Sequence, residues 1–321
     1  MTTFDDLRTA AQRAAAAVAP ATVSIGRDGR GTGIVIGPGK VLTNAHNLRD
    51  RTVQVGFTGG RTAQATVVAA DPDGDLVVLS VDTADASPLL WSNDEAQQGD
   101  IVFGASPTAD GVRVAFGMIS SVGRSFRGPR GRLVQGSLEH TAPLARGASG
   151  GPLVNAEGRL VAINTHRIGR AFYLALPGDA TLRQRIADLA AGKPPVQRRL
   201  GVALAPGDVA DKLRRSVGLP ERSGLLVRGV EAASPAAEAG VREGDLIVRA
   251  GDAELATTDD LHTALAGLAG LAGDVLTLHL VRGAEDLTVE VRFGEADASG
   301  SATTADGAND TTGNPTPGAS K

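Results

Sequence analysis

The chain has 321 residues, which is too long for one ordinary domain and predicts two folded units with unstructured ends. Lys and Arg number 32 against 36 for Asp and Glu, and the formal charge of −4 argues against a nucleic-acid-binding protein, which would usually be basic. The absence of cysteine excludes disulfides, thiol nucleophiles and cysteine-ligated metal sites.

The N-terminal segment, residues 1–20, is rich in alanine and ends at a proline, which predicts a helix over Thr3–Val18. Asp5 and Asp6 stand where a signal peptide would carry basic residues. No run approaches the roughly 18 apolar residues that a membrane span requires. We therefore expect a cytoplasmic protein without a membrane span. A cell-envelope protein from which a leader had been removed would have the same sequence.

Beyond residue 20, short runs rich in β-branched residues alternate with Gly, Pro, Asp or Asn. Strands are expected at Thr22–Gly26, Gly33–Ile36, Val53–Phe57, Thr66–Ala69, Leu76–Val81, Ile101–Ala105, Val112–Ile119, Leu153–Asn155, Leu160–Asn164 and Phe172–Leu176. Many short strands favour a barrel or sandwich. A helix at Ala180–Ala191 closes this first domain, residues 21–191, and a Pro-containing linker follows at residues 192–199.

Residues 200–294 have the size of one small domain, in which strands alternate with short helices. Strands are expected at Gly201–Leu204, Gly224–Val230, Leu246–Ala250, Val275–Val281 and Leu287–Phe293, and helices at Val209–Val217, Pro235–Ala239 and Thr258–Leu268. Residues 295–321 contain no Leu, Ile, Val, Met or aromatic residue, so we expect a disordered tail.

One serine, Ser149, lies in a turn dense with glycine. Such a turn can point the backbone N–H groups of Gly147 and Ser149 at one oxygen, as an oxyanion hole requires. A serine nucleophile also needs a base, and the base needs an orienting group. His46 ends the segment Val41-Leu42-Thr43-Asn44-Ala45-His46, directly after a strand, and Asp75 opens the strand at Leu76–Val81. The order His–Asp–Ser is that of chymotrypsin-type proteases, whereas subtilisins and α/β-hydrolases use other orders.

Each of these residues alone has an ordinary structural explanation, and only the three together favour a catalytic triad. Asp71 and Asp73 compete with Asp75, but the proline and glycine that follow them predict that both build the turn before it. His140 and His166 have no partner at metal-ligand spacing. We therefore expect no metal site, and a loop or surface position for both histidines.

With these motifs the chain resembles the HtrA/Deg (DegP-like) family of serine proteases, in which a trypsin-like domain is followed by a PDZ domain. The resemblance covers residues 15–294, and its landmarks in the first domain are Ala19-Pro20, Gly31–Gly33, Leu42–His46, Asp71…Asp75-Leu76, Gly117–Ser120, Gly147–Pro152, Ile163–Thr165 and Ala175–Pro177. It implies a mainly β protein, a chymotrypsin/trypsin-like double β-barrel followed by a PDZ domain. It also implies a site between the barrels, with His46 as general base, Asp75 orienting it, Ser149 as nucleophile and no cofactor.

The chain departs from the family around the serine. Ala148 stands where Asn is usual, and His140-Thr141-Ala142 stands where Thr-Asp-Ala is usual. These residues help to set the loop that forms the oxyanion hole, so the departures bear on the resting activity of the enzyme.

The resemblance also places Leu144 and Ile168 at the primary specificity pocket. Aliphatic walls imply cleavage after small or medium apolar residues, and such residues are buried in folded proteins, so the expected substrates are unfolded polypeptides. Arg167, next to the pocket position, is polar where aliphatic residues are common. It either narrows this preference or points to solvent.

In the second unit, Arg199-Leu200-Gly201-Val202 matches the PDZ loop whose N–H groups bind a C-terminal carboxylate, and the strand that follows would accept a peptide by β-augmentation. Leu261 and Leu265 share a helix face, which suits an apolar ligand pocket or a core position equally. Family members are commonly trimers or multiples of trimers that assemble through N-terminal aromatic residues. Phe4 is the only aromatic residue there, and we expect a homo-oligomer.

The sequence thus predicts a serine endopeptidase for protein quality control that attacks misfolded polypeptides, with a PDZ domain that binds apolar C-termini and regulates the protease. Two alternatives stay open. One is a non-proteolytic chaperone or scaffold with a collapsed oxyanion loop, and the other is a regulatory protease with one specific partner.

Overall fold

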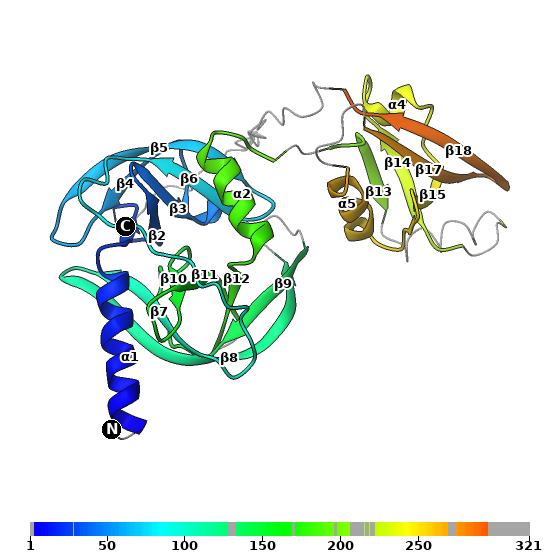
Figure 1. Cartoon of the computed structure of the whole chain (residues 1–321). Coiled ribbons are helices and arrows are strands. Elements are labelled where there is room, and N and C mark those ends of the chain that lie inside the picture. The colour runs from blue at the N-terminus through cyan, green and yellow to red at the C-terminus, as the bar shows by residue number, and fades with distance from the viewer. Residues whose placement is uncertain are drawn as a thin grey trace, which may run out of the picture. The chain divides into compact units, whose positions relative to one another are not determined.

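A computed structural model of the chain describes residues 3–27, 29–127, 133–168, 171–195, 198–205, 215, 218, 222–268 and 274–294 (Figure 1). The chain divides after Pro195, within the predicted linker, into two compact units. The protein is mainly β, as the sequence predicted. In the part of the chain that the structure describes, no helix is long and apolar enough to cross a membrane.

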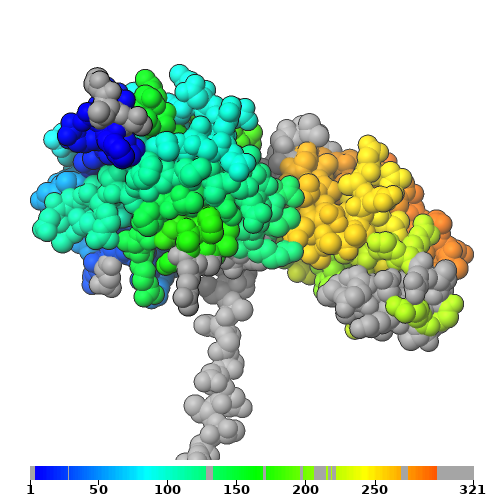
Figure 2. Space-filling view, turned by 90° about the horizontal axis from the view of Figure 1, so that it is seen from below, coloured from blue at the N-terminus to red at the C-terminus, as the bar shows by residue number. Residues whose placement is uncertain are grey.

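The first unit opens with helix α1 (Thr3–Val18), which occupies the residues predicted to be helical. Its buried face carries Ala14 and Val18, whereas Phe4 near its start is 85% exposed. In Figure 2 this helix, in dark blue, lies at the edge of the unit.

Six strands then form a closed barrel in the order β1-β2-β3-β6-β5-β4. They are β1 (Thr22–Ile25), β2 (Gly31–Gly37), β3 (Lys40–Thr43), β4 (Thr52–Gly56), β5 (Thr62–Asp71) and β6 (Leu76–Ser80). A short 3-10 turn, η1 (Ala45–Asn47), follows β3. The barrel interior is aliphatic and includes Val23, Ile25 and Leu79, so closing the barrel removes these side chains from water.

A second closed barrel has the order β10-β11-β12-β9-β8-β7. Its strands are β7 (Ile101–Thr108), β8 (Gly111–Arg127), β9 (Leu133–His140), β10 (Pro152–Val154), β11 (Leu160–Ile168) and β12 (Phe172–Pro177). Helix α2 (Ala180–Ala190) follows, and the Asp179 side chain caps it by accepting a hydrogen bond of 2.7 Å from the N–H of Leu182.

One cluster of buried side chains joins both barrels and both helices of this unit. It includes Val18 of α1, Leu42 of β3, Phe103 of β7, Ile163 of β11 and Leu189 of α2. Because this core is shared, the barrels are fixed against each other, and the loops at their junction are held by rigid elements.

The second unit holds a sheet with the strand order β13-β14-β15-β17-β18. Its elements are β13 (Val202–Ala205), β14 (Leu225–Val230), α4 (Pro235–Glu238), β15 (Leu246–Ala250), β16 (Ala253–Glu254), α5 (Thr258–Ala266), β17 (Val275–Arg282) and β18 (Glu285–Arg292). Its core is separate and, apart from Phe293, aliphatic. The helix predicted at Val209–Val217 lies, apart from Arg215, outside the described residues, as does the predicted tail.

Candidate active site

The ends of two neighbouring strands bring His46 and Asp75 together. The 3-10 turn after β3 carries His46, Asp75 directly precedes β6, and β3 pairs with β6. One oxygen of Asp75, Oδ2, lies 2.7 Å from Nδ1 of His46, and the other, Oδ1, accepts the backbone N–H of His46 at 3.0 Å. Asp75 is 2% exposed, so this carboxylate holds both the ring and the main chain of His46 in one orientation.

Asp75 has an unusual backbone conformation in the turn before β6. Asp75 has φ of +55°, in the left-handed region that Asp tolerates better than most residues. Asp71 accepts the N–H of Gly74 at 2.9 Å, and its other oxygen lies 3.4 Å from Arg185 of α2. Asp71 thus builds the turn, as the sequence predicted, and Asp75 is the acid that contacts His46.

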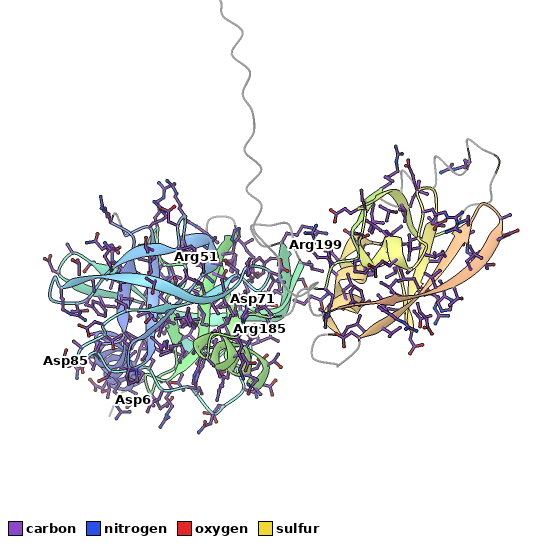
Figure 3. All side chains as sticks on the ribbon, turned by 90° about the horizontal axis from the view of Figure 1, so that it is seen from above. Asp6, Arg51, Asp71, Asp85, Arg185 and Arg199 are labelled. Carbon is purple, nitrogen blue, oxygen red and sulfur yellow. The ribbon has the colours of Figure 1, made fainter. Side chains whose placement is uncertain are left out.

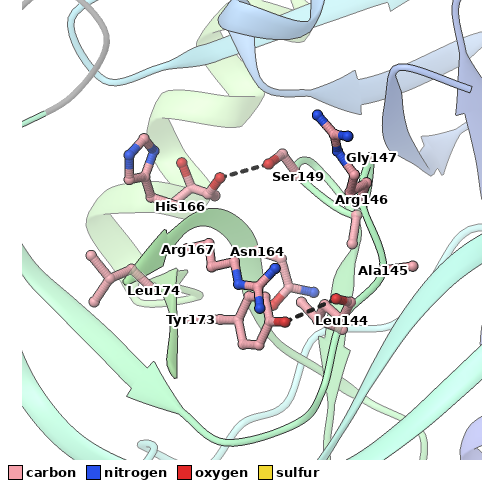
Figure 4. A pocket seen from close by; sticks show the side chains of 12 residues that line it. Leu144, Ala145, Arg146, Gly147, Ser149, Asn164, His166, Arg167, Tyr173 and Leu174 are labelled. Carbon is pink, nitrogen blue, oxygen red and sulfur yellow. Dashed lines mark hydrogen bonds between the residues drawn. The ribbon is translucent and has the colours of Figure 1, made fainter. Parts of the chain in front are cut away.

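Ser149 lies on the loop between β9 and β10, and Thr165 connects it to this pair. The Ser149 hydroxyl donates a hydrogen bond of 2.7 Å to the carbonyl oxygen of Thr165, drawn as a dashed line in Figure 4. The Thr165 hydroxyl donates to Oδ2 of Asp75 at 3.1 Å. Among the described residues, no hydrogen bond joins Ser149 to His46. The serine is therefore held next to the pair in a rotamer that points its proton at the main chain.

Two glycines give the serine loop its shape. Gly147 has φ of +82° and Gly150 has φ of +83°. A Cβ atom would lie 2.4 Å from the carbonyl oxygen of Gly29 at the first position and 2.2 Å from that of Thr32 at the second. Both positions therefore require glycine for backbone conformation and for space.

The first barrel holds the carbonyl groups of this loop. Thr32 donates its hydroxyl to the carbonyl oxygen of Gly147 at 2.7 Å, and the Asn47 amide donates to that of Ser149 at 2.9 Å. The backbone N–H groups of Gly147 and Ser149 donate to no acceptor within the described part of the chain. Among the described residues both N–H groups are thus without a protein acceptor, as donors to an oxyanion must be before a substrate arrives.

His140 is buried beside the loop, so the loop or surface position expected for it was wrong. It ends β9 with 0% exposure, its Nε2 lies 2.9 Å from Oδ1 of Asn164, and its Nδ1 accepts the N–H of Ala142 at 3.3 Å. Burial lowers the pKa of His140 from 6.5 to about 4, against the opposing effect of the Asn164 hydrogen bond. A neutral ring with its proton on Nε2 satisfies both contacts.

His166, in contrast, is exposed, and its ring stacks on Phe126 with centroids 5.8 Å apart. In the described ranges, no group of three or more His, Cys, Asp or Glu side chains is arranged to hold a metal ion.

A cavity of about 280 Å³ opens beside Ser149 (Figure 4). It is lined by Leu144, Ala145, Arg146, Gly147, Ala148, Ser149, Asn164, Thr165, His166, Arg167, Tyr173 and Leu174. Of the two residues expected at the specificity pocket, Leu144 lines this cavity. Ile168 is not among the lining residues and pairs with Phe172 at the far end of β11. Tyr173, which the sequence did not single out, donates its hydroxyl to the carbonyl oxygen of Leu144 at 2.9 Å.

The sequence alone assigns no role to Thr165 or Tyr173. The only signal for Thr165 was its place in the motif Ile163–Thr165. For Tyr173 the sequence held no signal beyond its being the single tyrosine of the chain.

In the second unit, Leu200 and Gly201 lead into the edge strand β13, which pairs on one side only, with β14, among the strands described. Gly201 has φ of +74°, and its carbonyl oxygen accepts the N–H of Glu231 at 2.8 Å. The carbonyl oxygen of Leu200 accepts the N–H of Ala236 at 3.0 Å. Both carbonyl groups are thus engaged, while the free side of β13 presents the backbone of Val202 for pairing.

Leu261 and Leu265 lie on α5 at 3% and 6% exposure, within the core of this unit. A contact of these leucines with a peptide ligand stays a prediction.

Comparison with known proteins agrees with this architecture. Residues 31–163 match the trypsin-like peptidase domain and residues 199–293 match the PDZ domain. The mitochondrial serine protease HTRA2 of Bos taurus is 32% identical over 279 residues, covering 81% of this chain and 59% of that protein. HTRA2 of Drosophila grimshawi is 31% identical over 257 residues, covering 74% and 60%. The chain therefore spans less than two thirds of the length of these relatives.

Among solved structures, the HtrA-type protease AlgW with a decapeptide is similar to this chain with a TM-score of 0.71 at 24% identity, covering 89% of this chain and 98% of that one. The serine endoprotease from Yersinia pestis gives a TM-score of 0.65 at 24% identity, covering 88% and 98%. These structures share the fold of both units. With the two domain types in this order and relatives of one kind, the chain belongs to the HtrA family of serine proteases.

Proposed function

We propose that the chain is a serine endopeptidase in which Ser149 is the nucleophile, His46 the general base and Asp75 the group that orients the base. One observation carries this proposal: both oxygens of the buried Asp75 carboxylate engage His46, at 2.7 Å and 3.0 Å. When the Nδ1–H group of a fixed imidazole donates to a carboxylate, the unprotonated Nε2 is available as a base.

The reaction begins when the Ser149 hydroxyl turns from the Thr165 carbonyl toward Nε2 of His46, a change of rotamer. His46 takes the proton as Oγ attacks the peptide carbonyl, and Asp75 stabilises the imidazolium that forms. The N–H groups of Gly147 and Ser149 bind the developing oxyanion. His46 then protonates the leaving amine as the peptide C–N bond breaks. In the second half of the reaction His46 takes a proton from water, which attacks the acyl-enzyme ester and releases Ser149.

The cavity next to Ser149 supports a preference for aliphatic side chains at the residue before the cleaved bond. Leu144 and Ala148 give it an apolar wall, at 9% and 4% exposure. Small or medium aliphatic side chains fit such a wall, and folded proteins bury these side chains, so unfolded or misfolded polypeptides are the proposed substrates and quality control the proposed role.

The second unit is proposed to bind C-terminal peptides with apolar ends and to regulate the protease. The open edge of β13 and the Gly201 turn support β-augmentation by an extended peptide. A homo-oligomer, a trimer or a multiple of it, is proposed as well, supported by the exposed Phe4 near the start of α1. The cytoplasmic location stays a prediction from the sequence.

The Ser149–Thr165 hydrogen bond is the observation that favours a second candidate, a chaperone or scaffold without proteolysis. A serine that never leaves this rotamer would not react, while the peptide-binding unit would still function.

Hydrolysis of unfolded casein by the full chain tests both candidates. We expect cleavage that Ser149→Ala abolishes and Ser125→Ala, an exposed serine on β8, leaves intact. A peptide with an apolar C-terminus should stimulate the wild type. If neither the wild type nor Ser149→Ala cleaves but both suppress aggregation of the unfolded client, the chaperone function replaces the protease.

A further inference from the structure

The cavity beside Ser149 carries positive charge on one side and an aliphatic wall on the other. We propose that Arg167 is a specificity-determining residue that lets this cavity bind a substrate side chain ending in a carboxylate, glutamate in particular, at the residue before the cleaved bond. The proposal rests on the proposed endopeptidase function and extends its substrate range beyond aliphatic residues.

Strand pairing places Arg167 at the cavity. Arg167 of β11 lies directly opposite Tyr173 of β12, and directly paired residues of antiparallel strands have side chains on the same face. The guanidinium carbon is 5.5 Å from the centre of the Tyr173 ring, within cation–π range. Figure 4 shows the Arg167 side chain reaching over this ring.

The surface beneath Arg167 is rigid. Tyr173 is 8% exposed and its hydroxyl is held by the carbonyl oxygen of Leu144, while its ring stacks on that of His140 with centroids 5.7 Å apart. An arginine that lies on a fixed ring loses less side-chain freedom when it binds a ligand than one that moves in water.

The charges of the lining have one sign. Arg146 and Arg167 are both among the lining residues, and the described lining contains no Asp or Glu. A substrate carboxylate in this cavity would therefore meet attraction from the Arg167 guanidinium, and a Lys or Arg side chain would meet repulsion. The planar guanidinium can also bind a carboxylate through two parallel hydrogen bonds.

Glutamate fits the two sides of the cavity better than a shorter acid. Its two methylene groups can lie along the apolar wall of Leu144 and Ala148, which leaves the carboxylate to reach toward Arg167. Aliphatic side chains use the same wall without the charge, so they remain substrates.

The test is a set of peptides that differ only in the residue before the cleaved bond, which is Leu, Gln, Glu or Lys. We measure kcat/KM for the wild type, Arg167→Leu, Arg167→Gln and Arg159→Leu, the last a matched change of an exposed arginine in the turn before β11. Glu and Gln have nearly the same size, so the Glu/Gln ratio isolates the effect of charge.

In the wild type we expect Glu to be preferred over Gln by about tenfold, the size of one charge-assisted contact, and Lys to be the poorest substrate. Arg167→Leu and Arg167→Gln should bring the Glu/Gln ratio close to one while cleavage of the Leu peptide persists, which also shows that the variants fold. Arg159→Leu should keep the wild-type ratio. Higher salt should reduce the Glu preference of the wild type.

A wild-type Glu/Gln ratio at or below one, or a ratio that both Arg167 variants leave unchanged, would overturn the specificity role while the endopeptidase function stands. Absence of cleavage of every peptide would instead remove the endopeptidase function and this proposal with it.

Discussion

The guanidinium of Arg185, on helix α2, lies 3.4 Å from the carboxylate of Asp71, and the two residues are labelled together in Figure 3. Asp71 also accepts the N–H of Gly74 and thereby shapes the turn in which Asp75 adopts its left-handed conformation. The last helix of the first unit is thus joined by an ion pair to the turn that orients the proposed base.

We expect Arg185→Ala to lower kcat by roughly threefold to tenfold and to leave KM nearly unchanged, because it loosens the turn that orients Asp75 without touching the substrate cavity. Arg185 is 43% exposed, so its loss should cost the unit less than about 1 kcal/mol of stability. Peptide kinetics check this, with Arg185→Lys expected to recover most of the rate. Gln184→Ala, a neighbouring change on the same helix, is the control, and an equal loss of rate in it would refute the role of the ion pair.

Thr165 allows a second test of how Asp75 is oriented, because its hydroxyl donates to Asp75 whereas its carbonyl oxygen accepts from Ser149. Thr165→Val removes the hydroxyl that donates to Asp75 at 3.1 Å and keeps the shape of the side chain and the carbonyl that holds Ser149. A net loss of about 1 kcal/mol for one hydrogen bond predicts a kcat that is lower by about fivefold. Thr165→Ser should retain the rate. If Val and Ser behave alike, the hydroxyl has no part in orienting Asp75.

The proposed triad could be located from the sequence because few residue types can do its chemistry and the chain order restricts them further. The structure brings His46 and Asp75 together as that reasoning expected. The place of Thr165 could not be foreseen, since a threonine in a strand has many ordinary roles and its contacts cross from one barrel to the other.

The burial of His140 could not be predicted from the sequence for a different reason. A histidine in a polar stretch suggests a surface position, and its burial depends on two partners, Asn164 and Ala142, that only the folded chain brings to its ring nitrogens. Strand β9 (Leu133–His140) was not expected either, because Gln135, Ser137 and Glu139 have weak strand preference. In the folded chain, pairing with β8 and β12 overrides this preference.

The serine loop allows a test that separates backbone strain from lack of space. Gly147→Ala would place a Cβ atom 2.4 Å from the carbonyl oxygen of Gly29, so the loop must shift and its N–H groups must leave the oxyanion position. We expect activity to fall at least about a hundredfold, the cost of losing an oxyanion donor.

Gly123 is the matched control for this change. Its φ of +70° is also left-handed, but nothing lies within 4 Å of a Cβ atom there. Gly123→Ala should therefore cost about 1 kcal/mol of stability from backbone strain alone and leave peptide cleavage intact. Equal activity losses in the two variants would mean that the Gly29 contact does not set the loop.

The buried His140 makes the stability of the first unit depend on pH. Its pKa is lowered from 6.5 to about 4 in the folded protein, so between these values the unfolded chain binds a proton that the folded chain does not. The contribution of the neutral His140 to the free energy of unfolding is therefore fully present above pH 6.5 and is lost as pH falls toward 4. For this histidine alone the loss between pH 7 and pH 5 should be about 2 kcal/mol.

Urea unfolding at pH 7 and at pH 5 measures this loss, followed by the fluorescence of Trp91, the single tryptophan of the chain, which packs against the core of the first unit. His140→Gln removes the titrating ring and keeps a side chain that can donate to Asn164. It should be less stable than the wild type at pH 7, and its own loss from pH 7 to pH 5 should be smaller by about the 2 kcal/mol that His140 contributes. His279→Gln, in the second unit, should retain the wild-type difference between the two pH values. A wild-type loss that His140→Gln reproduces in full would mean that groups other than His140 set the pH dependence of this unit.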